Sequence, residues 1–569
     1  MSRNSGVVPP MQSRRSPVGW SGVTVFIGFT VLSLAITWPA PGRFFTHLAA
    51  DSGDAWQFLF NIWWVKKKLT CGGNLFHTDY VFYPYGANLF LHTLSLFNSL
   101  PAALLSFFMD YIQAYNLVLL VHYPLAGFAA YKLFEHVTHD RPASFVSAAF
   151  FAFSPFHLCH GACHMQLCAV ELLPLALLFL LKTLEEANYR NPVWAALFVV
   201  LSALSSWYFL VFLFLLFAVF AGVGIFRRRK RDRGLLRRLA LLLGIVVIVL
   251  GPMVIAMVHA RLTVETVKGH SPWYWSADLQ NFFVPGQGSA LGSAFKDISK
   301  AWTGNREENS AYLGYTLLVL AFFAFKVRRQ RLMLYRKPFV IAGLVFLFYS
   351  LGPYLHFGGK VLKSIPLPMA LLDVIPLGFG TAPVRATLGT GLCLAGLACV
   401  GLAGLRARLE DRKYLKILVT AGVLITGLAE FWPGSFPTTR RPVPDFFGQM
   451  AAEPANYSVL DMRSFPEQMY GIIRHEKPLV NGHVARDPVE PRKKLYAIPV
   501  VKAMMARQKR FTPSRLKGGK ARALKDLGKL DIRYIIRRAG HSTAVEDSLG
   551  FEKVYQGKGV KIFLVPALK

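Results

Sequence analysis

The feature that most constrains this chain is a series of long apolar runs separated by more polar segments. Several of the eleven runs approach the roughly 20 residues that an α-helix needs to cross a bilayer. Of 569 residues, 53% are hydrophobic and only 17% are charged, whereas soluble proteins carry nearer a quarter charged residues. The sequence therefore predicts an α-helical multi-pass membrane protein of about eleven spans. The runs are 21–39, 114–134, 143–158, 166–182, 191–206, 207–226, 239–258, 311–326, 338–356, 386–405 and 415–432.

Three strongly basic loops set the predicted orientation, because loops rich in Lys and Arg stay in the cytoplasm. The first run then reads as an uncleaved span with a cytoplasmic N-terminus. The parity of crossings leaves no place for a full span at 93–109, which Asn98 and Pro101 interrupt. We interpret that run as a juxtamembrane helix or a re-entrant segment. The basic loops are "RRRKRDRGLLRR" (227–238), "KVRRQRLMLYRK" (326–337) and "RARLEDRKYLK" (406–416).

The patterning changes after residue 432, where "YSVLDM", "IRYIIRRA" and "VKIFLVP" are typical of strands in a small α/β domain. The parity places this part outside, and its many basic residues do not contradict that, since long domains translocate largely regardless of charge. We therefore predict a transmembrane domain over 1–432, with a first extracytoplasmic loop at 40–113. An extracytoplasmic α/β domain over 433–569 follows.

The formal net charge of +33 suits anionic lipid headgroups or phosphate-bearing ligands. No pattern in the chain favours binding of nucleic acid. Six cysteines in so long a chain do not make a disulfide scaffold.

Two acids, Asp51 and Asp54, follow the first run in "LAADSGDAWQFLFNIWWVKKKL", on the predicted outer face. The same loop holds His77, Asp79 and His92 within the aromatic stretch "NLFHTDYVFYPYGANLFLHT". Aromatic rings at this level are typical of a membrane-interface belt, and they also stack on sugar rings. The carboxylates belong either to an active centre or to a solvated loop.

A histidine-rich loop, "SPFHLCHGACHMQLC", lies between two predicted spans on the same side. His157, His160 and His164 are three and four residues apart, so a helix would place them on one face. Neutral imidazoles at this spacing can bind a transition metal, with Cys159 and Cys163 as further ligands. The alternative is a loop whose histidines hydrogen-bond to phosphate, sugar or backbone, and no carboxylate motif such as HExxH accompanies them.

Two further outer sites complete the set of candidate positions. Trp207 and Tyr208 lie in "LSSWYF" at an outer turn, and Arg385 lies in "FGTAPVRATLG" at the outer mouth of a span. An arginine there can fork onto a phosphate or a carboxylate. It can also act as an interfacial anchor that reaches toward headgroups.

The strings "GDAWQFLFNIWW", "FHTDYVFYPYGANL", "FAFSPFHLCHGACHMQL", "LSSWYF", "PVRAT" and "RHEKPLVNGHVARDP" together resemble a bacterial branch of the GT-C superfamily of polyprenyl-phosphate-dependent membrane glycosyltransferases. The resemblance implies an enzyme that moves a sugar from a lipid-phosphate carrier to an acceptor. It also implies that an acid of the first outer loop acts as general base or metal ligand. That position is Asp54, with Asp51 second. Ser52 and Gly53 separate the two acids, whereas the family often has a paired acidic motif. The sequence leaves two alternatives: Asp54 acts alone, or a divalent cation bridges the two acids.

Under this resemblance we expect inverting transfer, with burial against Trp56, Trp63 and Trp64 raising the pKa of Asp54. Arg385 would stabilise the departing phosphate. The tail segments "RHEKPLVNG" and "DPVEPRKK" would fold over the site, with Asn481 as a further contact. The expected substrate-binding residues are His77, His160, His164, Trp207, Tyr208, Arg385 and His475.

The implied partners are a polyprenyl-phosphate-linked sugar, a glycan, lipid or protein acceptor, and the lipids of the inner (plasma) membrane. The alternative function is a non-catalytic transporter of lipid-linked saccharides or a polysaccharide assembly factor. Transporters carry ionisable or Gly- and Pro-broken segments at mid-membrane, often with repeats. The predicted spans of this chain have few ionisable residues at their centres, and the chain shows no repeat. A third possibility is a degenerate member that only binds glycan through its basic tail.

Overall fold

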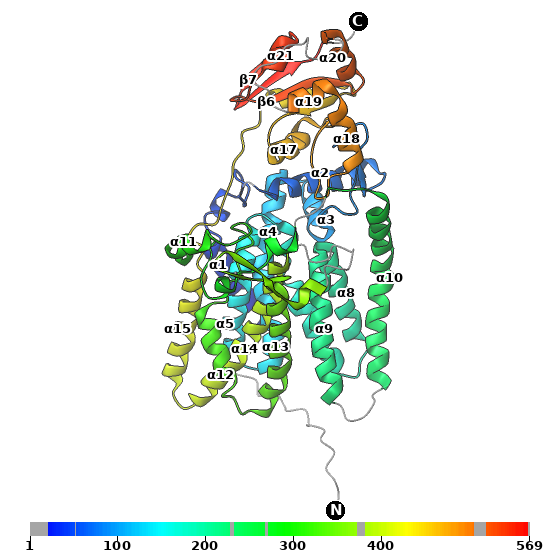
Figure 1. Cartoon of the computed structure of the whole chain (residues 1–569). Helices are drawn as coiled ribbons and strands as arrows, with labels where there is room; N and C mark the ends of the chain where they lie inside the picture. Colours follow the sequence, from blue (N-terminus) through cyan, green and yellow to red (C-terminus); the bar gives the residue numbers. More distant parts are fainter. Residues whose placement is uncertain are drawn as a thin grey trace, which may run out of the picture.

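The computed structural model describes residues 21–51, 53–227, 233–267, 271–371, 382–505 and 519–566. A bundle of long helices forms most of the molecule, and a smaller α/β domain packs on one end of it (Figure 1). Both parts of the predicted fold class are confirmed, whereas the predicted number of about eleven spans is not, because seven or eight helical segments of the described residues qualify as spans.

Seven helical segments among the described residues are long and apolar enough to cross a membrane. An eighth is added if α5 (Arg141–Ala152) and α6 (Pro155–Gly161), which bend by 43° between them, count as one span. The seven are α4 (Tyr111–Thr138), α7 (Leu172–Glu185) with the preceding η2 (Met165–Leu167), α9 (Trp207–Arg227), α10 (Arg233–Thr263), α13 (Gln330–Ser350), α14 (Thr387–Arg408) with η7 (Pro383–Ala386), and α15 (Lys413–Phe431).

Shorter apolar helices occupy the other predicted runs. They are α1 (Gly22–Ile36), α8 (Arg190–Ser205) and α12 (Tyr315–Ala324). With the bent pair, each of the eleven runs therefore contains helix. The run 93–109 holds only α3 (Leu96–Leu105), whose ten residues extend about 15 Å, which agrees with a juxtamembrane element.

Small residues allow α14 to pack closely against its neighbours, as is typical of membrane helices. A Cβ on Gly401 would lie 1.9 Å from the carbonyl oxygen of Leu320 on α12. A Cβ on Gly396 would lie 2.6 Å from the ring of Phe339 on α13. These contacts fix the position of α14, and hence of Arg385 just before its first turn.

The three basic loops lie together at the end of the bundle that is remote from the α/β domain (Figure 1). Arg408 donates to the carbonyl oxygen of Lys326 at 3.1 Å, and Arg227 donates to that of Leu334. Residues 228–232 of the first loop are outside the described residues.

The opposite end of the bundle carries the first outer loop. Its main element is α2 (Ala55–Cys71), which lies between the bundle and the α/β domain (Figure 1). The short strands β1 (His77–Thr78) and β2 (Ala87–Asn88) pair antiparallel beyond it. Further loops at this end contain η1 (Pro41–Arg43), η3 (Pro272–Trp275), η4 (Leu279–Phe282), η5 (Leu291–Phe295), α11 (Lys296–Ser299), β3 (Tyr354–Phe357), β4 (Lys360–Pro366) and η6 (Pro368–Leu371).

The C-terminal domain holds a four-stranded sheet in the order β5-β6-β8-β7, in which β5 and β6 are parallel and the other pairs antiparallel. The three segments predicted as strands form β5, β6 and β8. Its elements are α16 (Phe446–Ala452), β5 (Ser458–Asp461), α17 (Phe465–His475), α18 (Val489–Ala497), α19 (Pro499–Met505), α20 (Gly519–Gly528), β6 (Ile532–Arg538), α21 (Ala544–Ser548), β7 (Glu552–Gly557) and β8 (Val560–Leu564).

One segment of the C-terminal domain, residues 479–489, is hydrogen-bonded to the membrane part at several points. The Leu479 amide donates to the Tyr80 carbonyl at 3.0 Å, and the Val489 amide donates to the Glu265 carbonyl at 2.8 Å. The domain therefore covers the first outer loop and the end of α10.

Candidate active site

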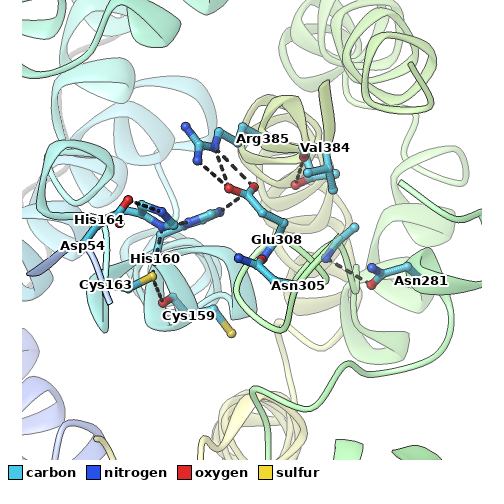
Figure 2. Close-up of polar contacts among 12 residues, drawn as sticks. Asp54, Cys159, His160, Cys163, His164, Asn281, Asn305, Glu308, Val384 and Arg385 are labelled. Carbon is cyan, nitrogen blue, oxygen red and sulfur yellow. Dashed lines mark hydrogen bonds and ion pairs between the residues drawn. The ribbon is translucent and has the colours of Figure 1, made fainter. Parts of the chain in front are cut away.

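Four segments that are distant in the sequence bring a cluster of ionisable side chains together at the covered end of the bundle (Figure 2). Asp54 precedes α2, and His160 lies in the last turn of α6. Glu308 comes from the long loop between α10 and α12, and Arg385 from η7. His164, in the turn between α6 and η2, completes the cluster.

Asp54 lies at the solvent side of this cluster. Its Oδ2 is 3.5 Å from Nε2 of His164, and the Asp54 side chain is 51% exposed against 10% for His164. The backbone carbonyl of Asp54 accepts from the amides of Gln57 and Phe58, while its side chain makes no cap hydrogen bond with α2. The carboxylate is therefore available to the histidine and to a ligand.

Beneath Asp54, two imidazoles continue the cluster inward. Nδ1 of His160 lies 3.1 Å from Nδ1 of His164. Nε2 of His160 lies 3.8 Å from Oε2 of Glu308. Both His160 and Glu308 are buried.

Glu308 and Arg385 form a buried, forked ion pair. Nε of Arg385 donates to both carboxylate oxygens, at 2.9 and 3.2 Å, and its Nη2 donates to Oε1. The guanidinium lies 5.0 Å from the ring centre of Tyr208. The Glu308 amide donates to the Asn305 side chain at 3.0 Å, which fixes the loop locally. Sequence reasoning did not identify Glu308.

The net electrostatic effect on both carboxyl groups favours their charged forms. Burial raises the pKa of Asp54, but the hydrogen bond and charge of His164, with smaller contributions from Arg385 and His483, hold it below its ordinary value. Burial likewise raises the pKa of Glu308, but Arg385 and then His160 lower it to about 2. The predicted rise in the pKa of Asp54 is therefore wrong.

The error comes from the charges around Asp54, since burial does raise its pKa but His164 and Arg385 outweigh that effect. The three tryptophans of α2 pack against other groups. Trp56 packs at a tilt against Tyr470 of the C-terminal domain, with ring centres 4.7 Å apart. Trp63 packs against Tyr80 at 4.9 Å, and the indole of Trp64 donates to the Leu75 carbonyl at 2.9 Å.

The histidine-rich loop divides into two groups. His157 points away from the cluster, where its Nδ1 lies 2.7 Å from the Ala152 carbonyl oxygen and its ring stacks on Tyr123. Cys163, rather than Cys159, lies beside the histidine pair, with Sγ 3.0 Å from Nδ1 of His164.

Asp51 forms a contact of its own. Its Oδ2 is 3.8 Å from Nη1 of Arg306, and its amide donates to the Ala162 carbonyl at 2.7 Å. It lines a small crevice with Cys159 and Arg306. Asp51 therefore pairs with a cation, whereas Asp54 pairs with His164.

The remaining predicted residues separate in space. Tyr208 contacts Arg385, while Trp207 packs against the apolar cluster of Val200, Ala203 and Leu250. His77 is exposed on β1.

His475 and Asn481 have contacts within the C-terminal domain. His475 is fully buried, its Nδ1 accepts from the Lys477 amide at 3.0 Å, and burial lowers its pKa to about 3. Asn481 accepts from the Asp461 amide at 3.2 Å.

His483 is a second residue that sequence reasoning missed. Its Nδ1 lies 3.0 Å from Asp487, and its charge contributes to lowering the pKa of Asp54. In the same segment, the Ala485 amide donates to Nδ1 of His92 at 3.0 Å. The stretch 479–489, which joins the two predicted tail segments, thus lies over the first outer loop, and His483 between those segments acts on the charge of Asp54.

Residues 63–425 match a family described as "Domain of unknown function (DUF6311)". The chain belongs to this family. A comparison of the DUF6311 chain with curated proteins finds no match.

Solved structures similar to the DUF6311 chain include two glycosyltransferases. Arabinofuranosyltransferase AftD from Mycobacteria has a TM-score of 0.60 at 15% identity, over 96% of this chain and 40% of AftD. The oligosaccharyltransferase of Archaeoglobus fulgidus has a TM-score of 0.51 at 11% identity, over 91% of this chain and 69% of that enzyme. The chain thus spans less than half the length of AftD. At these identities the likeness shows the fold, which is that of the GT-C glycosyltransferases.

Proposed function

We propose that this protein is an integral-membrane glycosyltransferase that moves a sugar from a polyprenyl-phosphate carrier to an extracytoplasmic acceptor. The observation that carries the proposal is the single cluster of Asp54, His164, His160, Glu308 and Arg385 on a GT-C fold. It joins a solvent-facing carboxylate to a buried guanidinium, which are the two charges that such a transfer needs.

Asp54 is the proposed general base. Its lowered pKa keeps the carboxylate ionised at neutral pH, so it is ready to accept a proton. As the acceptor hydroxyl attacks, Asp54 takes its proton, which contributes on the order of 10²–10⁴-fold to the rate.

Arg385 is the proposed contact of the leaving phosphate. Glu308 accepts from Nε and Nη2 of the guanidinium, and Nη1 is the nitrogen that a phosphate oxygen can approach. A cation that Glu308 already holds in place stabilises the departing charge without rearrangement.

The proposed reaction is a single displacement with inversion. The acceptor oxygen forms a bond to the anomeric carbon, the bond from that carbon to the phosphate oxygen breaks, and the phosphate keeps the electron pair. Glu308 is committed to Arg385, so Asp54 is the carboxylate of the cluster that faces the substrates. This supports one displacement rather than two, since a double displacement needs a second catalytic group.

The position of the cluster supports the enzyme over the transporter. Asp54 directly precedes α2, the helix between the bundle and the C-terminal domain, at the end opposite the three basic loops (Figure 1). The positive-inside rule supports an extracytoplasmic position for the cluster. A site at this level is open both to a lipid-linked donor in the bilayer and to a water-soluble acceptor.

The test compares Asp54→Asn with Asp79→Asn, an exposed acid of the same loop. Full-length protein in nanodiscs is incubated with a panel of polyprenyl-phosphate pentoses and hexoses and an extract of envelope glycans, and released polyprenyl phosphate is measured by mass spectrometry. We expect release by the wild type and by Asp79→Asn, and a loss of at least about 100-fold in Asp54→Asn. Full release by a folded Asp54→Asn variant would contradict the proposed base.

A further inference from the structure

Three soft donor atoms converge in the turn between α6 and η2. His160, Cys163 and His164 each offer one ligand atom, and these atoms all lie within 4.8 Å of one another. The two Nδ1 atoms are 3.1 Å apart, and Cys163 Sγ is 3.0 Å from His164 Nδ1. All three residues are buried.

Hydrogen bonding alone accounts poorly for this convergence. Two neutral imidazoles that face each other through Nδ1 share one hydrogen, so one of the two nitrogens presents a lone pair. A thiol then approaches Nδ1 of His164, which His160 already contacts. Two nitrogens and a sulfur around one point are the ligands that a borderline-soft metal ion takes.

The Nε2 atoms of both imidazoles also support metal binding. Nε2 of His164 faces Asp54 at 3.5 Å, and Nε2 of His160 faces Glu308 at 3.8 Å. A metal-binding histidine almost always directs its other N–H to a carboxylate, a carbonyl or water, which orients the ring. Here Asp54 lies beside the ring of His164, while Nε2 of His160 is buried without a hydrogen-bond partner and has Glu308 3.8 Å away. A metal ion on Nδ1 of His160 would direct its Nε2–H toward that carboxylate.

We infer that His160, Cys163 and His164 bind one transition metal ion of the zinc class through Nδ1, Sγ and Nδ1, while Asp54 and Glu308 orient the two imidazoles. Such a set selects against Mg²⁺ and Ca²⁺, which prefer oxygen ligands. Asp54 is thus a positioning residue for the metal site and not a ligand.

The spacing fits zinc after a small adjustment. With bonds of about 2.0 Å to nitrogen and about 2.3 Å to sulfur, tetrahedral ligands lie roughly 3.3–3.5 Å apart. The two short contacts therefore need to open by roughly 0.2–0.5 Å. The third pair of ligand atoms lies within 4.8 Å and needs to close, and side-chain rotations supply both changes. Three protein ligands leave the fourth position of a tetrahedral ion to water or a substrate oxygen.

The metal site is inferred from its own geometry and is tested without the transfer reaction. Full-length protein in nanodiscs is loaded with Zn²⁺, dialysed, and its metal content measured by mass spectrometry. Co²⁺ replaces Zn²⁺ in a parallel sample, because a cysteine ligand then gives a thiolate-to-cobalt charge-transfer band in the near ultraviolet.

The variants are Cys163→Ser and His160→Gln, with Cys159→Ser and His157→Gln as matched controls from the same loop. We expect one equivalent of zinc in the wild type and both controls, no charge-transfer band in Cys163→Ser, and at least a tenfold loss of zinc affinity in His160→Gln. Substoichiometric zinc in the wild type, or a band that persists in Cys163→Ser, would overturn the inference.

Zinc binding by the Asp54→Asn variant tests whether Asp54 is a metal ligand or a positioning residue. Asp54→Asn should keep one equivalent of zinc with about 10–100-fold weaker binding, the usual effect of losing such a partner. Complete loss of zinc in folded Asp54→Asn would instead make Asp54 a ligand and overturn its assigned role. If polyprenyl phosphate is released equally with and without zinc, the proposed function stands and the metal is structural.

Discussion

Each end of the helix bundle holds an ion pair between an arginine and a carboxylate, but the two pairs have different neighbours. At the covered end Arg385 forks onto Glu308, and at the basic end Arg406 forks onto Asp140, with Nε to its two oxygens at 2.9 and 3.1 Å. Glu308 faces His160, and His160 and His164 lie between Glu308 and Asp54 (Figure 2). Asp140 instead caps α5 by accepting from the Ala143 amide at 3.0 Å.

This difference teaches that pairing alone does not mark a site. The pair at the basic end ties helix ends together, and its neighbours include the hydroxyls of Thr420 and Ser144 and the Ala143 amide. The pair at the covered end lies within a continuous set of titratable groups that reaches solvent at Asp54. The titratable neighbours of an ion pair, rather than the pair itself, indicate a functional site.

The largest expected effect concerns which end faces outward. Of the six cysteines, Cys71 at the end of α2 is exposed and the other five are buried. A membrane-impermeant maleimide should label Cys71 in intact spheroplasts. In a Cys71→Ser background, Lys413→Cys at the basic end should be labelled only after permeabilisation. The reverse pattern would place Asp54 in the cytosol and reject the proposed transfer.

The next effect is the cost of breaking each pair. Glu308→Gln leaves a buried arginine without its carboxylate, which costs about 3–5 kcal/mol of unfolding free energy. Asp140→Asn should cost less, because its carboxylate is more exposed, at 22% against 4% for Glu308. Thermal unfolding in detergent measures both.

Transfer assays complete that comparison. Only Glu308→Gln should abolish release of polyprenyl phosphate beyond what its lower stability explains. Equal loss of release in both variants, at a temperature where both are folded, would remove the functional distinction between the two ends.

Acid should destabilise the covered end through Glu308. Its pKa falls from an ordinary 4.5 to about 2 on folding. A carboxyl group with a depressed pKa stabilises the fold fully above its unfolded pKa, and this contribution disappears as pH falls through the folded value. Unfolding temperature should therefore fall between about pH 4.5 and pH 2, and the fall should be shallower in Glu308→Gln than in the wild type. Parallel curves would contradict the assigned coupling to Arg385.

Much of the fold was predictable because its signals are local. The apolar runs, the basic loops and the strand segments of the C-terminal domain each depend on composition within a short window. The orientation stays a prediction that needs only the basic loops and a count of crossings. Asp54, His160, His164 and Arg385 could be proposed for the site because each follows or precedes a span on the same side.

Other members of the site depend on packing that no short window contains. Glu307 and Glu308 are adjacent in the sequence, and burial against Arg385 distinguishes them only in the folded chain. Cys163 lies beside the histidine pair and Cys159 does not, because α6 ends between them. His475 was proposed and is in a core, whereas His483, eight residues later, lies in the segment over the first outer loop.

The smallest expected effect comes from two neighbours at the start of α9. Tyr208 presents its ring to Arg385 at 5.0 Å, and Trp207 packs into the apolar cluster between α8 and α10. A cation over an aromatic ring contributes about 0.5–2 kcal/mol, so Tyr208→Leu should raise the KM for the lipid-linked donor several-fold and leave kcat nearly unchanged. Tyr208→Phe keeps the ring and should behave as the wild type in this respect. Trp207→Leu should lower the unfolding temperature without changing KM. If the two leucine variants raise KM equally, the contact between Tyr208 and Arg385 does not help to hold the donor phosphate, and the distinction between the two neighbours is one of packing alone.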